Sequence, residues 1–189
     1  MSAARKTVAV TALALACSVV TSHAYTGGPA RAEIVGYEPS GHKVFYRLHF
    51  YDESGKPPEV YCFDLNDSEP AKAFRARDME QTTGWSQKGW RVRKRLLRLR
   101  GVSDFDLKLV VRADSVGINT SWDEPQYQIR ATVELESRHR TVDLLALCDP
   151  LVRVRGVYLI PGRMERIVVI SYIGRVYRCE ETDLPILIP

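Results

Sequence analysis

The strongest constraint on the fold is a ten-residue segment, 127–136, in which apolar and polar side chains alternate without a break. Tyr, Ile, Ala, Val and Leu occupy its odd-numbered positions, and Gln, Arg, Thr and Glu occupy its even-numbered positions. Successive side chains of a β-strand point to opposite faces, so the pattern predicts a strand with one face on a core and one in water. Because antiparallel sheets commonly expose one face to solvent, the segment favours an antiparallel β-fold.

Shorter segments on both sides of this strand extend the β-prediction. Four consecutive apolar residues, Ile167–Ile170, predict a central strand that is covered on both faces. Pro161-Gly162 and Ile173-Gly174 mark turns beside it. The predicted fold class is therefore mainly β (α+β), an antiparallel meander or a sandwich-like sheet with one or two inserted helices. Strands are expected at 34–37, 43–51, 59–65, 105–112, 127–136, 141–148, 152–160, 166–172 and 175–179.

The expected helices fall between the two β-rich halves, in a helical insert at about 69–101. Glu69–Arg77 suits a short helix with Ser68 as its N-cap. Gly89–Arg100 has apolar residues at helical spacing, and Gly101 can end that helix. The start of this second segment also alternates with period two, so a strand stays open there. Its apolar positions at helical spacing are Val92, Leu96 and Leu99, with Trp85 one heptad earlier.

The N-terminus has the order of a cleaved secretory signal. The cations Arg5 and Lys6 precede an apolar run, 7–20, and Ser22-His23-Ala24 follows it with small residues at the first and third places. The run of 14 residues is shorter than the roughly 20 that a spanning helix needs. We expect a signal peptide at 1–24, a flexible lead-in at 25–31 and a single β-rich domain at 32–189.

Two alternatives to this cleaved signal stay open. The segment could remain attached as an uncleaved anchor, or Cys17 could be lipidated, which would tether the protein to a membrane. In either case the chain is expected to be exported, as a periplasmic or secreted protein. The first 24 residues hold two of the 27 Lys and Arg and none of the 23 Asp and Glu, so the remainder carries a net charge of +2. Export and this small charge argue against a nucleic-acid partner.

Three cysteines follow the signal, and their number limits how they can pair. Export would place them in an oxidising compartment, where disulfides persist. Because three is odd, at most one intramolecular bridge forms. The favoured interpretation is that Cys62, Cys148 and Cys179 are buried thiols that act as small apolar residues. If a bridge forms, the expected pair is Cys148 with Cys179, the closer pair in sequence.

Residues 32–67 have a recurring arrangement of strands and turns. A strand leads into Pro-Ser-Gly-His-Lys, an aromatic strand follows, and a Ser-Gly-Lys-Pro loop leads to Val60–Leu65, which ends in Phe-Asp-Leu. This arrangement resembles one blade of a TolB-like β-propeller and covers 36 of the 189 residues. A blade takes roughly 40–45 residues and a propeller at least four blades, so the chain is too short for a whole propeller. The chain as a whole looks like exported bacterial proteins, a resemblance that implies no activity.

The sequence contains no specific catalytic constellation. It lacks a Gly-x-Ser-x-Gly elbow, a His-Glu-x-x-His pair, a Cys-x-x-Cys pair and a Gly-rich phosphate loop. A hydrolase would need tertiary contacts to complete a site around a histidine. The histidines that follow the signal are His42, His49 and His139.

The segment 64–69 places oxygen ligands at alternate positions, in Asp64, Asn66 and Ser68. Such spacing suits a hard cation, but the sixth and twelfth positions that an EF-hand reserves for Gly and Glu hold Glu69 and Arg75. A polar turn is therefore the favoured interpretation, and no metal or cofactor is predicted.

The most unusual feature is a basic stretch, 88–100, with seven cations and no acid between Glu80 and Asp104. Such a stretch can bind an anionic envelope surface, since each cation near an anionic membrane contributes on the order of 1 kcal/mol. The competing interpretation is a solvated helix whose apolar stripe packs on the sheet. The candidate binding residues are Trp85, Lys88, Trp90, Arg91, Arg93, Lys94, Arg95, Arg98 and Arg100.

Three functional hypotheses follow from these features. The favoured one is an exported, non-catalytic β-domain with a structural or binding role in the bacterial envelope, whose partner is left open between an envelope protein and an anionic envelope surface. The second is a peripheral binder of anionic envelope surfaces through 88–100. The third is a hydrolase with a site that only the tertiary structure assembles.

Overall fold

The computed structural model describes residues 30–51, 58–66, 74–75, 96–103, 105–119, 123–174 and 179–189, with the side chains of 74, 75 and 119 left aside. Within these ranges the chain forms three antiparallel sheets, and no helix there is long and apolar enough to cross a membrane. The strands are β1 (Ala30–Glu38), β2 (Lys43–Phe50), β3 (Glu59–Asp64), β4 (Phe74–Arg75), β5 (Arg100–Val102), β6 (Leu107–Asn119), β7 (Glu124–Leu135), β8 (Arg138–Leu147), β9 (Val152–Leu159), β10 (Arg166–Ile173) and β11 (Glu181–Ile188).

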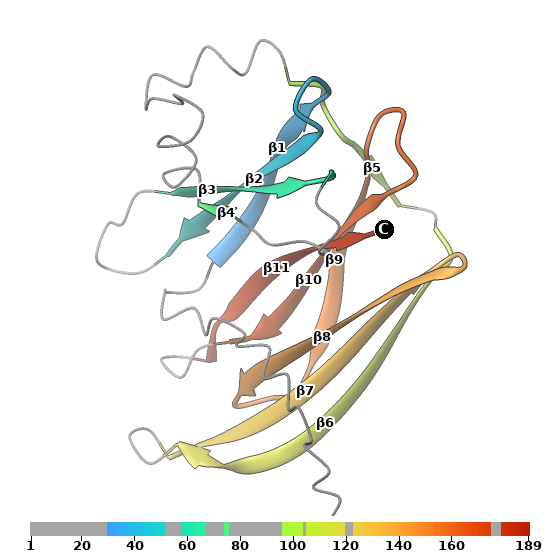
Figure 1. Ribbon diagram of the computed structural model, residues 1–189. Helices are drawn as coiled ribbons and strands as arrows, with labels where there is room; N and C mark the ends of the chain where they lie inside the picture. The colour runs from blue at the N-terminus through green and yellow to red at the C-terminus, as the bar shows by residue number, and fades with distance from the viewer. Residues whose placement is uncertain are drawn as a thin grey trace, which may run out of the picture.

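The three sheets stack as layers, which Figure 1 shows from top to bottom. Sheet A has the order β1-β2-β3-β4, sheet B the order β11-β10-β9-β5, and sheet C the order β6-β7-β8. One apolar cluster packs sheet A on sheet B, and a second packs sheet B on sheet C. Sheet B is therefore the middle layer, and the mainly β, antiparallel fold class predicted from the sequence is confirmed.

Strand β10 shows why sheet B occupies the middle. Ile167 and Val169 belong to the cluster shared with sheet A, whereas Val168 and Ile170 belong to the cluster shared with sheet C. Each of the four side chains is at most 3% exposed. Alternate side chains of a strand point to opposite faces, so four consecutive apolar residues fill both cores. The covered central strand predicted from this run is confirmed.

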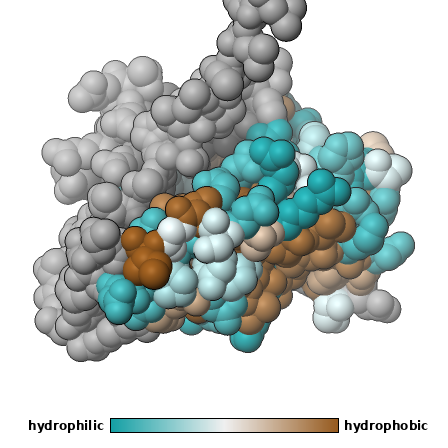
Figure 2. Space-filling view, turned by 90° about the horizontal axis from the view of Figure 1, so that it is seen from below, coloured by the Kyte–Doolittle hydropathy of each residue, from teal (hydrophilic) through white to brown (hydrophobic). Residues whose placement is uncertain are grey.

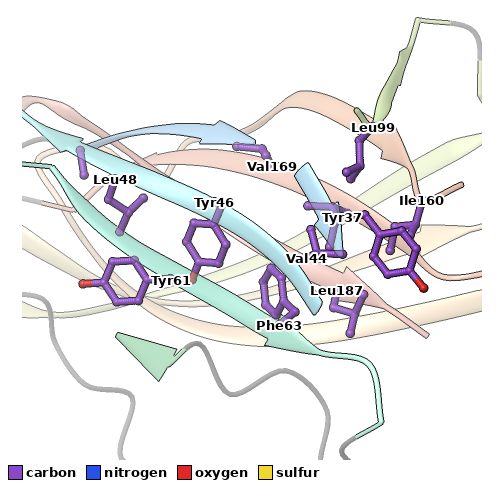
Figure 3. Close-up of a cluster of buried hydrophobic side chains, with 12 residues drawn as sticks. Tyr37, Val44, Tyr46, Leu48, Tyr61, Phe63, Leu99, Ile160, Val169 and Leu187 are labelled. Atoms are coloured by element: carbon purple, nitrogen blue, oxygen red, sulfur yellow. The ribbon is translucent and has the colours of Figure 1, made fainter. Parts of the chain in front are cut away.

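Aromatic side chains of sheet A dominate the core between sheets A and B (Figure 3). The ring of Tyr46 stacks on Tyr61 with 5.4 Å between centroids, and it lies 5.1 Å from the ring of Phe63. Val44 and Leu48 point into the same core from the same face of β2. Large aromatic groups bury much apolar surface per residue, so this part of the core needs few side chains.

The insert at 69–101 was expected to be helical, and the prediction is wrong wherever the structure describes it. Phe74–Arg75 pairs with β3 as strand β4, and Arg100–Val102 pairs with β9 as strand β5. Leu97 forms two backbone hydrogen bonds of 2.8 Å with Tyr37, so this segment is extended and spans from sheet A to sheet B. Sheet pairing overrides helical spacing here, because the backbone groups of this segment find partners on β1 and β9. The rest of the insert lies outside the described residues.

The close crossing of this segment over β1 depends on Gly36. A Cβ atom at Gly36 would lie 2.8 Å from the Cβ of Leu96 and 3.2 Å from the carbonyl oxygen of Leu97. Any larger residue would push the extended segment away from β1. The register of β1 also shifts between Ile34 and Gly36, which is a bulge that turns the end of β1.

The C-terminal strand is a second departure from the sequence prediction. The last strand was expected at 175–179, but Cys179 lies in a single 3₁₀ position, residues 175–178 lie outside the described ranges, and the strand spans Glu181–Ile188. Pro185 is tolerated within this strand because β11 is an outer strand of sheet B, where a missing N–H can face away from the ladder.

Candidate functional site

The basic stretch is only partly described, and its described residues are not helical. Arg98 and Arg100 are exposed on the extended segment that leads into β5. Neither is hydrogen-bonded to an acid within the described ranges. The other candidate binding residues, Trp85, Lys88, Trp90, Arg91, Arg93, Lys94 and Arg95, lie outside those ranges.

The three histidines lie on two different sheets. His49 binds the carboxylate of Glu33 with 2.8 Å between Nε2 and Oε2, and both side chains are open to solvent. Nδ1 of His42 lies 3.3 Å from the hydroxyl oxygen of Tyr37 at the other end of β2. His139 is paired with Glu134 across β8 and β7 in sheet C. The fold thus brings none of these three into a common group within the described ranges.

Asp64, the first residue of the cation-like pattern, stabilises a turn. Its Oδ1 accepts a hydrogen bond of 3.0 Å from the backbone N–H of Asn66, and its Oδ2 lies 3.8 Å from Nζ of Lys43. An aspartate that binds the backbone two residues ahead forms an Asx-turn. Ser68 of this pattern lies outside the described residues.

Cys148 and Cys179 form a disulfide with 5.9 Å between their Cα atoms, so these two are not the free thiols that the sequence favoured, and they are the pair expected if a bridge formed. The bridge joins the end of β8 in sheet C to the start of β11 in sheet B. Glu124 lies beside it, and one ligand atom from each of these three residues falls within 4.8 Å of the others. The two sulfur atoms are bonded to each other, so they are not the thiolates that a metal would need.

Cys62 is a buried thiol on the far face of sheet A, packed with Phe45 and partly buried apolar residues. Burial raises its pKa to about 11, and the nearby charge of Lys43 opposes that rise. A thiol with so high a pKa is a poor nucleophile at neutral pH.

A charged cluster links the two ends of the described chain, β1 and β11. Asp183 is buried, and its Oδ2 accepts a hydrogen bond of 3.0 Å from the backbone N–H of Ala32. Arg31 reaches Glu181 at 3.2 Å and Asp183 at 3.5 Å. Arg155 also lies near both carboxylates, at 3.3 and 3.6 Å.

The electrostatics of this cluster fit a structural role. Burial alone would raise the pKa of Glu181, but the hydrogen bond and charge of Arg31 outweigh it and lower that pKa. Sequence reasoning missed the cluster because Arg31 and Glu181 are 150 residues apart. Its acids each have arginine partners, so it holds β1 of sheet A against β11 of sheet B.

The outer face of sheet C is polar and forms cross-strand pairs. Arg130 on β7 binds Asp143 on β8 at 2.8 Å, and the hydroxyl groups of Thr132 and Thr141 lie 2.9 Å apart. The two residues of these pairs on β7, Arg130 and Thr132, occupy even-numbered positions of the alternating segment 127–136. A depression of about 270 Å³ lies on this face, lined by Val110, Arg112, Arg130, Thr132 and Glu134. Seen from below, the molecule shows polar and apolar groups side by side (Figure 2).

Strand β6 forms the outer edge of sheet C and extends seven residues beyond the strand expected at 105–112. Within the described part of the chain it pairs with β7 alone, and every residue from Val111 to Ile118 is exposed. The exposed fractions include 55% for Val116 and 62% for Ile118. Unpaired backbone N–H and C=O groups on such an edge are a template for another strand.

The other outer strands are protected from such pairing. Strands β4 and β5 have two and three residues, and β11 contains Pro185. Strands β1 and β8 each contact β11. Short length, proline and coverage each block a sheet edge, and among the described residues β6 has none of these three. Strand β6 does carry charged side chains and a bulge between Ser115 and Gly117, so its regular edge for pairing is the part before the bulge.

Comparisons with known proteins give no relative. No protein-family model matches the chain, and neither the curated proteins nor the solved structures contain a match. The resemblance of 32–67 to a TolB-like blade stays a prediction.

Proposed function

We propose that the chain is an exported, non-catalytic β-domain of the bacterial envelope that binds a protein partner by adding a strand to β6. The signal-like prefix and the Cys148–Cys179 disulfide support export, because disulfides persist in oxidising compartments. Cys62, which does not take part in the bridge, is buried, and this suits a protein that passes through such a compartment.

The observation that carries the binding role is the open edge of β6. It has 13 residues, apolar side chains exposed at Val111, Val116 and Ile118, and neighbours on one side only within the described ranges. An extended peptide that adds to such an edge gains main-chain hydrogen bonds, and alternate side chains of the edge give specificity.

Site-specific photo-crosslinking in cells tests this proposal. A photoreactive phenylalanine analogue replaces Val110 or Ala113 on the edge strand, and Gln128 on the neighbouring strand β7 is the matched control on the same sheet. We expect the protein in the envelope fraction to form crosslinked species from the two β6 positions and far fewer from β7. Absence of any crosslink from β6 in the envelope, or its recovery only in the cytoplasm, would contradict the proposal.

A second candidate function is binding of anionic envelope surfaces through 88–100. Arg98 and Arg100 favour it because both are exposed, and cations at a membrane surface attract anionic lipids. Co-sedimentation with vesicles that contain phosphatidylglycerol, at low and high salt, measures this binding. Replacing Arg91, Arg93, Lys94 and Arg95 by Gln should abolish the low-salt binding, and unchanged binding would exclude this function.

A further inference from the structure

The charges on the outer face of β6 have no partners of their own. Within the described residues, Arg112 and Asp114 make no ion pair, whereas Lys108 on the same face binds Glu134 at 3.2 Å. Across the ladder, Arg112 is placed opposite Arg130, and Arg130 is already bound to Asp143. An exposed cation and an exposed anion two positions apart therefore remain on the outer face of an open strand.

We propose that the strand that pairs with β6 is β6 of a second copy of this chain, antiparallel and centred on Ala113. This inference rests on the proposed binding role of the β6 edge. A two-fold axis perpendicular to the sheet keeps the polar faces of both copies on one side. Residues directly opposite each other then have numbers that sum to twice 113.

The pairing follows from this register. Arg112 of each copy faces Asp114 of the other, which makes two reciprocal ion pairs. Val111 faces Ser115 beside them on the inner side, where Ala113 faces its own copy. Opposite charges directly across two strands stabilise a sheet. The paired segment is Val111–Ser115, which ends before the bulge between Ser115 and Gly117, and it joins two three-stranded sheets into one of six strands.

The neighbouring registers are less favourable for the same physical reason. Centring the pair on Arg112 would place the two Arg112 guanidinium groups opposite each other, and centring it on Asp114 would do so for two carboxylates. Like charges directly across two strands are destabilising. Centring on Val111 would leave Arg112 against Val110 and direct Asp114 to Lys108, which is already engaged by Glu134. Sliding one strand by a single residue along the other would place the polar positions of one copy opposite the apolar positions of the other.

Single charge reversals test the register. Arg112→Asp puts two acids on each copy, and Asp114→Arg puts two cations on each copy, so each variant alone repels itself. Sedimentation velocity of the purified protein over a concentration series should show self-association of the wild type. Each single variant should weaken it roughly tenfold or more, because two attractive pairs become repulsive.

The decisive arm mixes the two single variants. The acid introduced at position 112 of one copy then faces the cation introduced at position 114 of the other, and the native Asp114 of the first copy faces the native Arg112 of the second. The mixture should therefore associate about as well as the wild type, and the double variant R112D/D114R should also self-associate. Asp106→Arg, which makes the same charge change as Asp114→Arg at an exposed position outside β6, is the matched control and should leave association unchanged.

Three outcomes would overturn the proposal. A wild type that stays monomeric up to roughly 1 mM excludes self-pairing. Association that survives both single variants, or that the mixture fails to restore, excludes this register. Crosslinks from β6 to a different protein, with a monomeric wild type, would retain the binding role of the edge but exclude a second copy as the occupant, whereas no crosslink at all would contradict both.

Discussion

Strands β10 and β6 both contain β-branched apolar residues, but these residues lie in opposite environments. Ile167–Ile170 in β10 is at most 3% exposed, whereas Val111 in β6 is 37% exposed and Val116 is 55% exposed. Strand β10 lies between β9 and β11 in the middle layer, while β6 lies at the free edge of an outer layer (Figure 1). The position of a strand in the layers therefore decides whether its apolar residues form part of the core or lie on a surface that a partner can contact.

The largest expected effect concerns the disulfide that ties sheet C, which contains β6, to sheet B, which contains β10. The Cys148–Cys179 bridge ties sheet C to sheet B across 31 residues, and a loop of this length corresponds to about 3.5 kcal/mol of chain entropy in the unfolded state. We expect the double replacement of both cysteines by Ser to lower the free energy of unfolding by that amount in urea titrations.

Reduction of the wild type should give the same loss as the double replacement, which serves as its control. A loss below about 1 kcal/mol would mean that apolar packing alone holds sheet C on sheet B.

Matched valine replacements compare the strands directly. Val168→Ala in β10 should cost about 2 kcal/mol, because it removes buried methyl groups and leaves a cavity. Val111→Ala in β6 removes the same atoms from a half-open site and should cost less than about 0.5 kcal/mol. Equal losses in chemical denaturation would show that β6 is covered in solution. If β6 pairs with a second copy, the cost of Val111→Ala should grow with protein concentration.

The third test leaves stability nearly unchanged and compares the outer faces of sheets A and C. Cys62 on sheet A is 1% exposed with a pKa of about 11, whereas Gln128 on sheet C is exposed. At neutral pH a thiol reagent should modify the variant Gln128→Cys at least roughly 100-fold faster than Cys62, since burial and fewer thiolates both slow Cys62. Similar modification rates for the two thiols would mean that the outer face of sheet A opens far enough to expose Cys62 to the reagent.

The same thiol gives a pH dependence with a defined sign. Its pKa is raised from 9.0 to about 11 in the folded protein, so the folded state holds its proton more tightly than the unfolded state does. The stability that Cys62 contributes is therefore complete below pH 9 and is lost as pH rises between these values. Cys62→Ala should remove this part of the alkaline decline.

The sequence predicted strands well where the residue pattern is local. The expected segments 43–51, 152–160 and 166–172 match β2, β9 and β10 within a residue at each end. Helical spacing misled the prediction near Leu96 and Leu99, because two apolar residues three apart also fit an extended segment that passes between two sheets. Strand β11 was not predicted, because the last expected strand ended at Cys179, before it begins.

The candidate site was less predictable than the fold. Binding was predicted in 88–100, most of which lies outside the described residues, and residues 113–119 have no sequence feature that predicted a role. A single strand pattern cannot show which of its two edges is paired. The Arg31–Glu181 link was hidden for a related reason, since its partners meet only when sheets A and B pack.

By itself the sequence determined the mainly β class, the two-sided burial of Ile167–Ile170 and which two cysteines would pair if a bridge formed, because side-chain alternation and cysteine spacing are read directly from the sequence. Only the tertiary structure decided that sheet B is the middle layer and that β6 is the open edge. Layer order and strand neighbours depend on contacts between distant segments, and it is those contacts that leave Arg112 and Asp114 facing solvent together.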